Sequence, residues 1–186
     1  MTEYDKEQAF TDRYGDALMR TVAASFGCNN IERVTDRDTQ IRGVDYYMWR
    51  SAPRSIKQEV DIKIDHYANN NFVFECTQQY NGIGEASWAE HNDDIWIAYF
   101  KIALKKVYIF RLGDLKAFRN SDVFAERKLF ETNIRINGKP ATFKNFRLEE
   151  LPIHHVVDVE LFYNPFTDDR SLLEVKESLS DIQLYM

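Results

Sequence analysis

In the stretch Gln58-Glu59-Val60-Asp61-Ile62-Lys63-Ile64-Asp65, polar and apolar side chains alternate strictly from Glu59 onward. Because successive side chains of a β-strand point to opposite faces, this alternation predicts a half-buried strand over residues 56–65. Asp61 and Lys63 then share the polar face, about 6–7 Å apart along the chain. Such a face is either a solvated surface with alternating charges or a place where a carboxylate and an ammonium act on one reacting atom.

Two further strands are predicted beside this one. Residues 43–49 contain Val, Tyr, Met and Trp side chains that favour strands, and residues 72–77 are largely apolar. Turn-forming residues separate the three segments, which predicts an antiparallel meander. Each strand carries one conspicuous acid, and neighbouring strands can bring the three acids side by side: Asp45, Asp61 and Glu75.

Hydrophobic spacing predicts the remaining elements. Gly27 is followed by two asparagines, which is typical of a left-handed cap at the end of a first helix. Residues 30–42 are polar and are interpreted as a loop or a short irregular strand, and residues 78–90 as a long loop near the strand ends. The other predicted segments are helices over residues 5–27, 112–118 (continuing or restarting to 130) and 171–180, and strands over residues 95–100, 107–110, 133–139, 141–146 and 156–163.

Length and composition favour one intracellular domain. The chain has 186 residues, of which 44% are hydrophobic, enough for one core and too few for two comfortable domains. No apolar run approaches the roughly 18 residues that span a membrane, and the acidic N-terminus differs from a signal peptide. Cys28 and Cys76 lack metal-ligand spacing and are typical of reduced thiols. We therefore expect a cytoplasmic protein.

The charge of the chain is unevenly distributed. Its net charge is −6, which taken alone argues against a nucleic-acid binder. Residues 1–100 have a net charge of −7, whereas residues 101–120 carry six Lys or Arg and only Asp114, a net charge of +5. This pattern fits a metal site beside a phosphate-contacting surface, and it fits internal charge complementarity equally well.

Carboxylates that converge on one point repel one another unless a cation lies between them. A small number of oxygen ligands suits Mg²⁺ or Mn²⁺, which retain several waters and bind substrate phosphates. Lys63 shares a strand face with Asp61, so its ammonium can orient a water or stabilise charge that develops on a phosphate. His154 and His155 are expected on opposite faces of a strand, which argues against a shared metal role for them.

The order of these elements resembles the PD-(D/E)xK nuclease superfamily. The resemblance rests on a helix, a strand that begins at Asp45, and a later strand in which Asp61-Ile62-Lys63 occupies the place of the (D/E)-x-K motif. Val44 stands where the family has an optional Pro. The polar approach over residues 40–45 is similar to that of phage and bacterial members.

This resemblance implies an α+β fold of the restriction-endonuclease-like type. The family has an αβββαβ core in which helices flank a central mixed sheet. For this chain the resemblance implies a single domain over residues 1–186, with the core at about residues 5–120. Residues 121–186 would then form a C-terminal extension packed on the core.

The resemblance also implies Mg²⁺- or Mn²⁺-dependent hydrolysis of phosphodiester bonds in DNA. Asp45, Asp61 and the backbone carbonyl of Ile62 would hold the metal ion. Lys63 would position the attacking water. Further acids of the site would come from the third strand or from the first helix, where several candidates stay open: Glu75, Asp16, Asp12 and Glu7.

Contacts with nucleic acid are expected from the basic segment and from the long loop, at Lys101, Lys105, Lys106 and Trp88, the last by stacking on a base. Two alternatives stay open. In a second alignment with the motif, Asp61 is its first acid and residues 75–77 hold its second acid with the Lys lost. The alternative function is that of a non-catalytic binding or accessory module, of phage or bacterial type. Either function is compatible with a homodimer.

Overall fold

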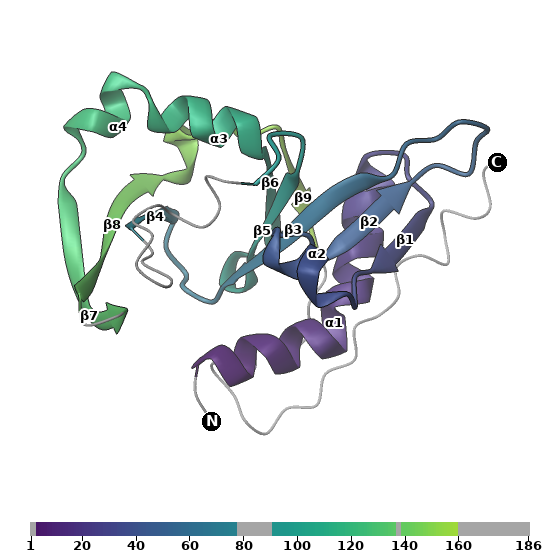
Figure 1. The fold of residues 1–186 in the computed structure, drawn as a ribbon, viewed down its shortest axis with the longest axis horizontal. Helices are drawn as coiled ribbons and strands as arrows, with labels where there is room; N and C mark the ends of the chain where they lie inside the picture. The colour runs from purple at the N-terminus through teal and green to yellow at the C-terminus, as the bar shows by residue number, and fades with distance from the viewer. Residues whose placement is uncertain (1–2, 78–90, 137–138, 160–186) are drawn as a thin grey trace.

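The structure is a computed structural model that describes residues 3–77, 91–136 and 139–159 (Figure 1). Helices, short 3-10 turns and strands follow one another in a mixed order. The elements are α1 (Glu3–Ser25), β1 (Asn30–Arg33), α2 (Arg37–Ile41), β2 (Tyr46–Trp49), β3 (Gln58–Asp65), β4 (Asn71–Thr77), β5 (Trp96–Lys101), η2 (Ile102–Leu104), β6 (Lys106–Arg111), α3 (Leu112–Arg119), α4 (Asp122–Glu126), β7 (Leu129–Ile136), β8 (Lys139–Arg147), η3 (Leu148–Glu150) and β9 (His155–Asp158).

Two sheets organise these elements. The larger sheet has six strands in the order β1-β2-β3-β5-β6-β9, and the smaller has the order β4-β8-β7. In the larger sheet β3 and β5 run parallel, and every other neighbouring pair runs antiparallel. The expected α+β class, with a mixed sheet flanked by helices, is confirmed. Among the described residues, no helix is long and apolar enough to cross a membrane.

The predicted meander forms from different strands than expected. Its members are β1, β2 and β3, and β1 together with α2 lies in the segment 30–42 that was interpreted as irregular. Asp36 begins α2, because its side chain accepts a hydrogen bond from the Thr39 backbone N–H at 2.9 Å. The segment 72–77 is a strand, but β4 leaves the larger sheet and pairs with β8, so its expected place beside β3 is wrong.

Each face of the larger sheet covers its own core. On one face α1 packs side chains such as Leu18 and Val22 against Met48 and Val60. On the other face, Ile97 of β5 belongs to an aromatic-rich core, which draws on β4, β6, β8, α3 and α4. The second core explains the position of β4, because its alternate residues Phe72 and Phe74 are buried there with Phe110 and Phe146.

Three segments of the prediction cannot be compared with the structure. The loop at residues 78–90, the end of the strand predicted at 156–163 and the helix predicted at 171–180 lie outside the described residues, wholly or in part. Within the described part, β9 adds a strand to the larger sheet by pairing with β6. Residues beyond 120 therefore contribute to the same sheet as the predicted core.

Candidate active site

Backbone pairing brings Asp45 next to Asp61. Asp45 directly precedes β2, and its N–H donates to the carbonyl of Val60 at 2.9 Å, while its own carbonyl accepts from Val34 N–H at 2.8 Å. The Asp45 carboxylate reaches across to β3, where Oδ2 accepts a hydrogen bond from the backbone N–H of Ile62 at 2.9 Å. The first acid of the predicted motif is therefore fixed beside the second by the strand register.

Asp61 is a buried acid with a charged partner. Its residue is only 2% exposed, and its Oδ1 lies 2.9 Å from Nζ of Lys63, whose side chain is 56% exposed. Burial raises the pKa of Asp61 to about 7; the Lys63 ammonium opposes this rise, and the charge and hydrogen bond of the Asp45 carboxyl add to it. Asp61 thus contacts both Asp45 and Lys63, the two residues predicted to act with it, and the ammonium of Lys63 belongs to a largely exposed side chain.

This arrangement can accept a divalent cation. Two carboxylates in contact, one of them buried, carry a mutual repulsion that a cation would relieve. In the described parts of the chain, no group of three or more His, Cys, Asp or Glu side chains converges to hold a metal ion. Mg²⁺ is commonly held by one or two carboxylates, with waters and substrate phosphates completing its shell. The donor set of Asp45 and Asp61 fits that description.

The backbone that leads into Asp45 is held by a close contact. Gly43 has a φ of +78°, and a Cβ placed on it would lie 2.2 Å from Nδ1 of His91. The backbone at His91 is itself held in place by a hydrogen bond, since Nζ of Lys116 donates to the His91 carbonyl at 2.5 Å. Gly43 is therefore required both for its conformation and for the approach of the His91 ring.

Substituting Gly43 with Ala is expected to cost at least about 1 kcal/mol more than substituting Gly27 with Ala. Both residues lie in the left-handed region, so both variants carry strain of about 1–2 kcal/mol. At Gly27 the added Cβ meets only the end of the flexible Arg50 side chain at 3.2 Å, whereas at Gly43 it collides with His91. Urea unfolding of the two variants measures the difference, and equal losses would contradict it.

Asp12 and Asp16, two of the candidate acids of the first helix, have other partners. Asp16 Oδ1 accepts a hydrogen bond from the Tyr46 hydroxyl at 2.7 Å. Tyr46 faces α1, and burial, followed by the contact with Asp16, raises the pKa of its hydroxyl. Asp12 forms an ion pair with Arg33 at 2.5 Å. The structure therefore gives Asp16 a role in docking α1 onto β2, in place of the role in the site that was expected for it.

Glu75 and Asp61 lie on strands of different sheets. In β4, Glu75 lies opposite Phe143 of β8, in the smaller sheet. The strand next to β3 on that side is β5, where Ile97 lies opposite Asp61. The reason for expecting Glu75 in the site, a place on the adjacent strand, does not hold, because β4 pairs within the other sheet.

The basic segment is mostly engaged with carboxylates of the chain itself. Among the residues expected to contact nucleic acid, Lys101 is fully buried, which is incompatible with that role, and Lys106 lies 3.4 Å from Asp158. Arg111 and Lys116 form ion pairs with Asp94 and Asp93. Lys105 is exposed, and Trp88 lies outside the described residues. Internal charge complementarity, one of the two interpretations of the sequence, accounts for most of this segment.

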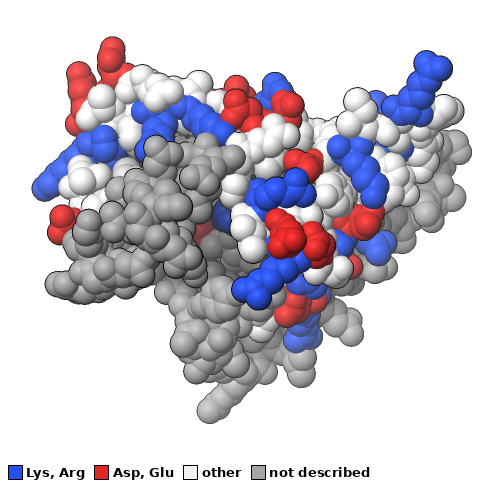
Figure 2. Space-filling view, viewed as in Figure 1, with Lys and Arg blue, Asp and Glu red and all other residues white. Residues whose placement is uncertain are grey.

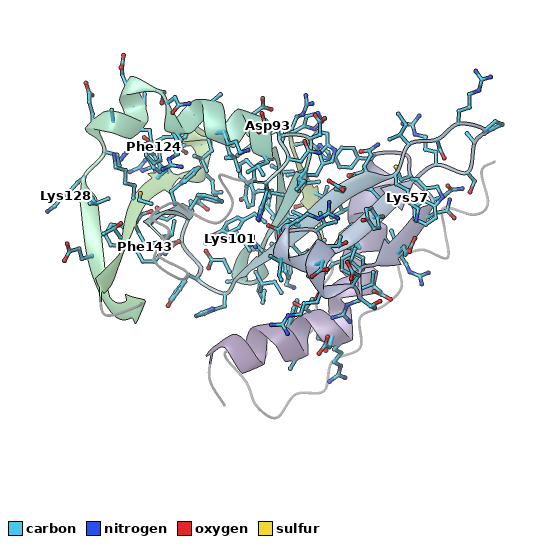
Figure 3. The ribbon with its side chains drawn as sticks, in the orientation of Figure 1. Lys57, Asp93, Lys101, Phe124, Lys128 and Phe143 are labelled. Atoms are coloured by element: carbon cyan, nitrogen blue, oxygen red, sulfur yellow. The ribbon has the colours of Figure 1, made fainter. Side chains whose placement is uncertain are left out.

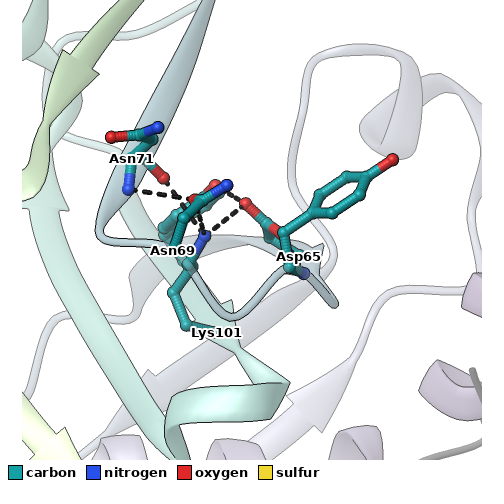
Figure 4. Close-up of polar contacts among 6 residues, drawn as sticks. Asp65, Asn69, Asn71 and Lys101 are labelled. Carbon is teal, nitrogen blue, oxygen red and sulfur yellow. Dashed lines mark hydrogen bonds and ion pairs between the residues drawn. The ribbon is translucent and has the colours of Figure 1, made fainter. Parts of the chain in front are cut away.

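The sequence patterns missed a buried polar cluster at the end of β3 (Figure 4). The Lys101 ammonium donates to Asp65 Oδ2 at 2.8 Å, to Asn69 Oδ1 at 3.3 Å and to the Asn71 carbonyl at 3.1 Å. Tyr99 donates its hydroxyl to the same Asp65 oxygen. The sequence did contain an indication of this cluster, namely a Lys at the end of an apolar strand and Asp65 at the end of the alternating strand. The two side chains meet because β3 pairs in parallel with β5.

A second cluster was also unexpected. His154 Nδ1 lies 2.6 Å from His155 Nδ1, and His155 Nε2 lies 2.8 Å from Ser25 Oγ at the end of α1. The two histidines converge because β9 begins at His155, so His154 does not follow the alternation of a strand. Phe26 and Trp96 pack against His154. The cluster joins the end of α1 to the edge strand of the larger sheet.

Comparison of the chain with family models, with curated proteins and with solved structures gives no match. The function of the protein is therefore inferred from the chemistry of its own residues.

Proposed function

We propose that this protein is a metal-dependent phosphodiesterase that hydrolyses DNA. The observation that carries the proposal is the contact of buried Asp61 with Asp45 on one side and with the ammonium of Lys63, a largely exposed side chain, on the other. Perturbed acids in contact with a specific charged partner are frequent at catalytic sites. The acid pair suits Mg²⁺ or Mn²⁺, and an ammonium beside it suits a phosphate as the group acted upon.

Each residue has a role in this proposal. Asp45 and Asp61, together with the backbone carbonyl of Ile62, would hold the cation, which lowers the pKa of a bound water and neutralises charge on the phosphate. Asp45 is pre-positioned because the Ile62 N–H donates to it. Lys63 donates hydrogen bonds toward the attacking water and toward the negative charge that develops on the phosphate oxygens. Its contact with Asp61 keeps the ammonium at that position.

The arrangement of strands supports the likeness to the PD-(D/E)xK superfamily. A first helix, an antiparallel meander of three strands and a strand parallel to the third agree with the αβββαβ order, apart from the short helix α2 between β1 and β2 and from one further difference. Between β3 and β5, the described residues contain β4 rather than a helix. Asp45 directly precedes β2 and Asp61 lies on β3, in keeping with a family motif that has one Asp at a strand start and (D/E)-x-K on a later strand.

Substituting Lys63 with Ala is expected to lower the rate of DNA cleavage in Mn²⁺ by about 10²–10³-fold. This is the usual effect of removing one hydrogen-bond donor that stabilises the negative charge developing in the transition state. Cation binding should persist, because both carboxylates remain. Lys128→Ala is the matched control, since that side chain is exposed and lies outside the acid pair. Supercoiled plasmid and labelled duplex oligonucleotides serve as substrates. Unchanged cleavage by the Lys63 variant would rule out its proposed role.

A second candidate function is a non-catalytic binding or accessory module. The observation that favours it is the engagement of the basic segment, where Lys101 is buried and Lys116 is paired with Asp93. The two functions differ in their need for a cation. Calorimetry with Mn²⁺ at pH 8 separates them, because the phosphodiesterase requires binding at the acid pair. Absence of binding at millimolar Mn²⁺ would favour the binding module.

A further inference from the structure

The connection between β2 and β3, residues 50–57, forms a projecting arm. Figure 1 shows it extending beyond the ends of both strands, and all eight residues are exposed. Ile56 is 83% exposed, more than any other large hydrophobic residue of the described chain. Arg54 has a φ of +67°, in the left-handed region that non-glycine residues rarely adopt. A strained residue two positions from an exposed apolar side chain is typical of a segment that binds a ligand or a macromolecule.

The arm is a basic segment on an acidic protein. It contains Arg50, Arg54 and Lys57 and no acid, whereas the whole chain has a net charge of −6. Glu32, which forms a surface ion pair with Lys57, offsets one of these three charges and leaves two net positive charges. Arg50 keeps its charge, because its partner, the Phe26 carbonyl, is neutral. In Figure 2 blue side chains project at the end of the molecule where Figure 1 places the arm. This charge is complementary to a polyanion.

The arm is continuous with the face that carries the acid pair. Tyr47 and Trp49 alternate with Asp45 along β2 and therefore share its face. The Lys57 ammonium lies over both rings, 5.1 Å from the centroid of Tyr47 and 4.8 Å from that of Trp49. Lys57 and Asp61 are four positions apart in the chain, a span of about 13 Å along an extended strand. A polyanion held at the arm can therefore reach the acid pair along one strand face.

We propose that the arm binds the sugar-phosphate backbone of double-stranded DNA on one side of the bond that is cut. The position of the cut rests on the proposed function, but binding by the arm does not. A duplex is stiff over this distance, so two contacts about 13 Å apart on a straight ribbon suit it better than a flexible single strand. That span corresponds to about four base pairs at 3.4 Å each. Arg54 and Lys57 contact phosphates, and Ile56 contacts the sugar edge of the groove.

The test measures DNA binding in EDTA, so that no cleavage is needed. A double variant, Arg54→Ala with Lys57→Ala, is compared with Arg20→Ala with Lys128→Ala, which removes the same charge from exposed sites outside the arm. Figure 3 places Lys57 and Lys128 at opposite ends of the molecule. The arm variant should bind a 20-base-pair duplex about tenfold more weakly, with a log-log salt slope smaller by about 2. The control should change affinity by less than about twofold.

A length series tests the geometry. Affinity of the unmodified protein should rise until the duplex covers the arm and the acid pair together, and the arm variant should lose that rise. Equal weakening by the arm and control variants would overturn the proposal. Equal binding of single-stranded DNA, or equal competition by polyglutamate, would also overturn it, because the arm would then be a general anion site.

The outcomes separate this proposal from the proposed function. If Lys63→Ala leaves cleavage unchanged while the arm variant loses duplex binding, the arm stands and the catalytic assignment falls. If Lys63→Ala abolishes cleavage while the arm variant binds normally, the catalytic assignment is supported and the proposal for the arm is contradicted. Thermal unfolding of the arm variant provides the folding control. Both substituted side chains are exposed, so the loss of the surface ion pair of Lys57 with Glu32 should lower the free energy of unfolding by less than about 1 kcal/mol.

Discussion

Asp61→Asn is expected to abolish metal-dependent cleavage and, at the same time, to make the metal-free protein more stable above pH 7. The loss of activity should exceed about 10³-fold, because the variant loses a charged ligand of the cation at the centre of the site. The gain in stability arises because an ionised Asp61 is buried and lies against the Asp45 carboxyl. Asn is close to Asp in size and carries no charge, and the exposed Lys63 does not become a buried unpaired ion.

The pH dependence of that gain follows from the pKa of Asp61. Its ordinary value is 3.8 and its value in the folded protein is about 7, so the folded state binds the proton more tightly than the unfolded state. The stability contributed by this proton is complete below about pH 4 and is lost as pH rises through about 7. A difference of about three pKa units corresponds to about 4 kcal/mol. The free energy of unfolding of Asp61→Asn, relative to that of the wild type, should therefore increase between pH 4 and pH 7 and stay constant above pH 7.

Urea unfolding in EDTA at pH 5 and at pH 8 measures this difference. Asp94→Asn is the control, because the Asp94 side chain is 71% exposed and its ion pair with Arg111 lies at the surface. Cation binding provides a second measurement, since a proton on Asp61 competes with the metal ion. Affinity for Mn²⁺ should fall as pH drops below about 7 in the wild type. A free energy difference that is the same at both pH values would contradict the assignment.

Lys101→Met is expected to destabilise the protein by about 3–5 kcal/mol, the usual cost of removing one partner from a buried ion pair. The Lys101 side chain is fully buried and that of Asp65 is 11% exposed, so the substitution leaves a carboxylate with little solvent. The three acceptors of the ammonium also tie the turn after β3 to the start of β4. The cost thus includes the connection between the larger sheet and the strand that enters the smaller one.

A matched substitution and a double variant identify the cause. Lys106→Met removes an ion pair whose Lys and Asp158 side chains are 44% and 86% exposed, and it should cost less than about 1 kcal/mol. Combining Lys101→Met with Asp65→Asn should recover part of the loss, because the unpaired buried charge disappears. Urea unfolding at pH 7 measures all of these variants. Equal losses for Lys101→Met and Lys106→Met would show that burial of the pair is not the source of the effect.

The local pattern of the sequence was sufficient to predict the three central residues of the candidate site. Alternation over residues 58–65 placed Asp61 and Lys63 on one face of a strand, and the acid before β2 identified Asp45. These predictions hold because the spacing of side chains along a strand depends on backbone geometry alone. The short antiparallel connection between β2 and β3 then aligns the acids, so that their meeting follows from neighbours in the chain.

Only the tertiary structure decided which strands became neighbours elsewhere. The apolar alternation of β4 suits either sheet, and its burial among Phe110 and Phe146 selected the smaller sheet, which removed the case for Glu75 beside Asp61. The parallel pairing of β3 with β5 joins segments more than thirty residues apart in the chain, and it buried Lys101 against Asp65. Burial and partner choice depend on such non-local packing, so the raised pKa of Asp61 could not be predicted from the order of residues.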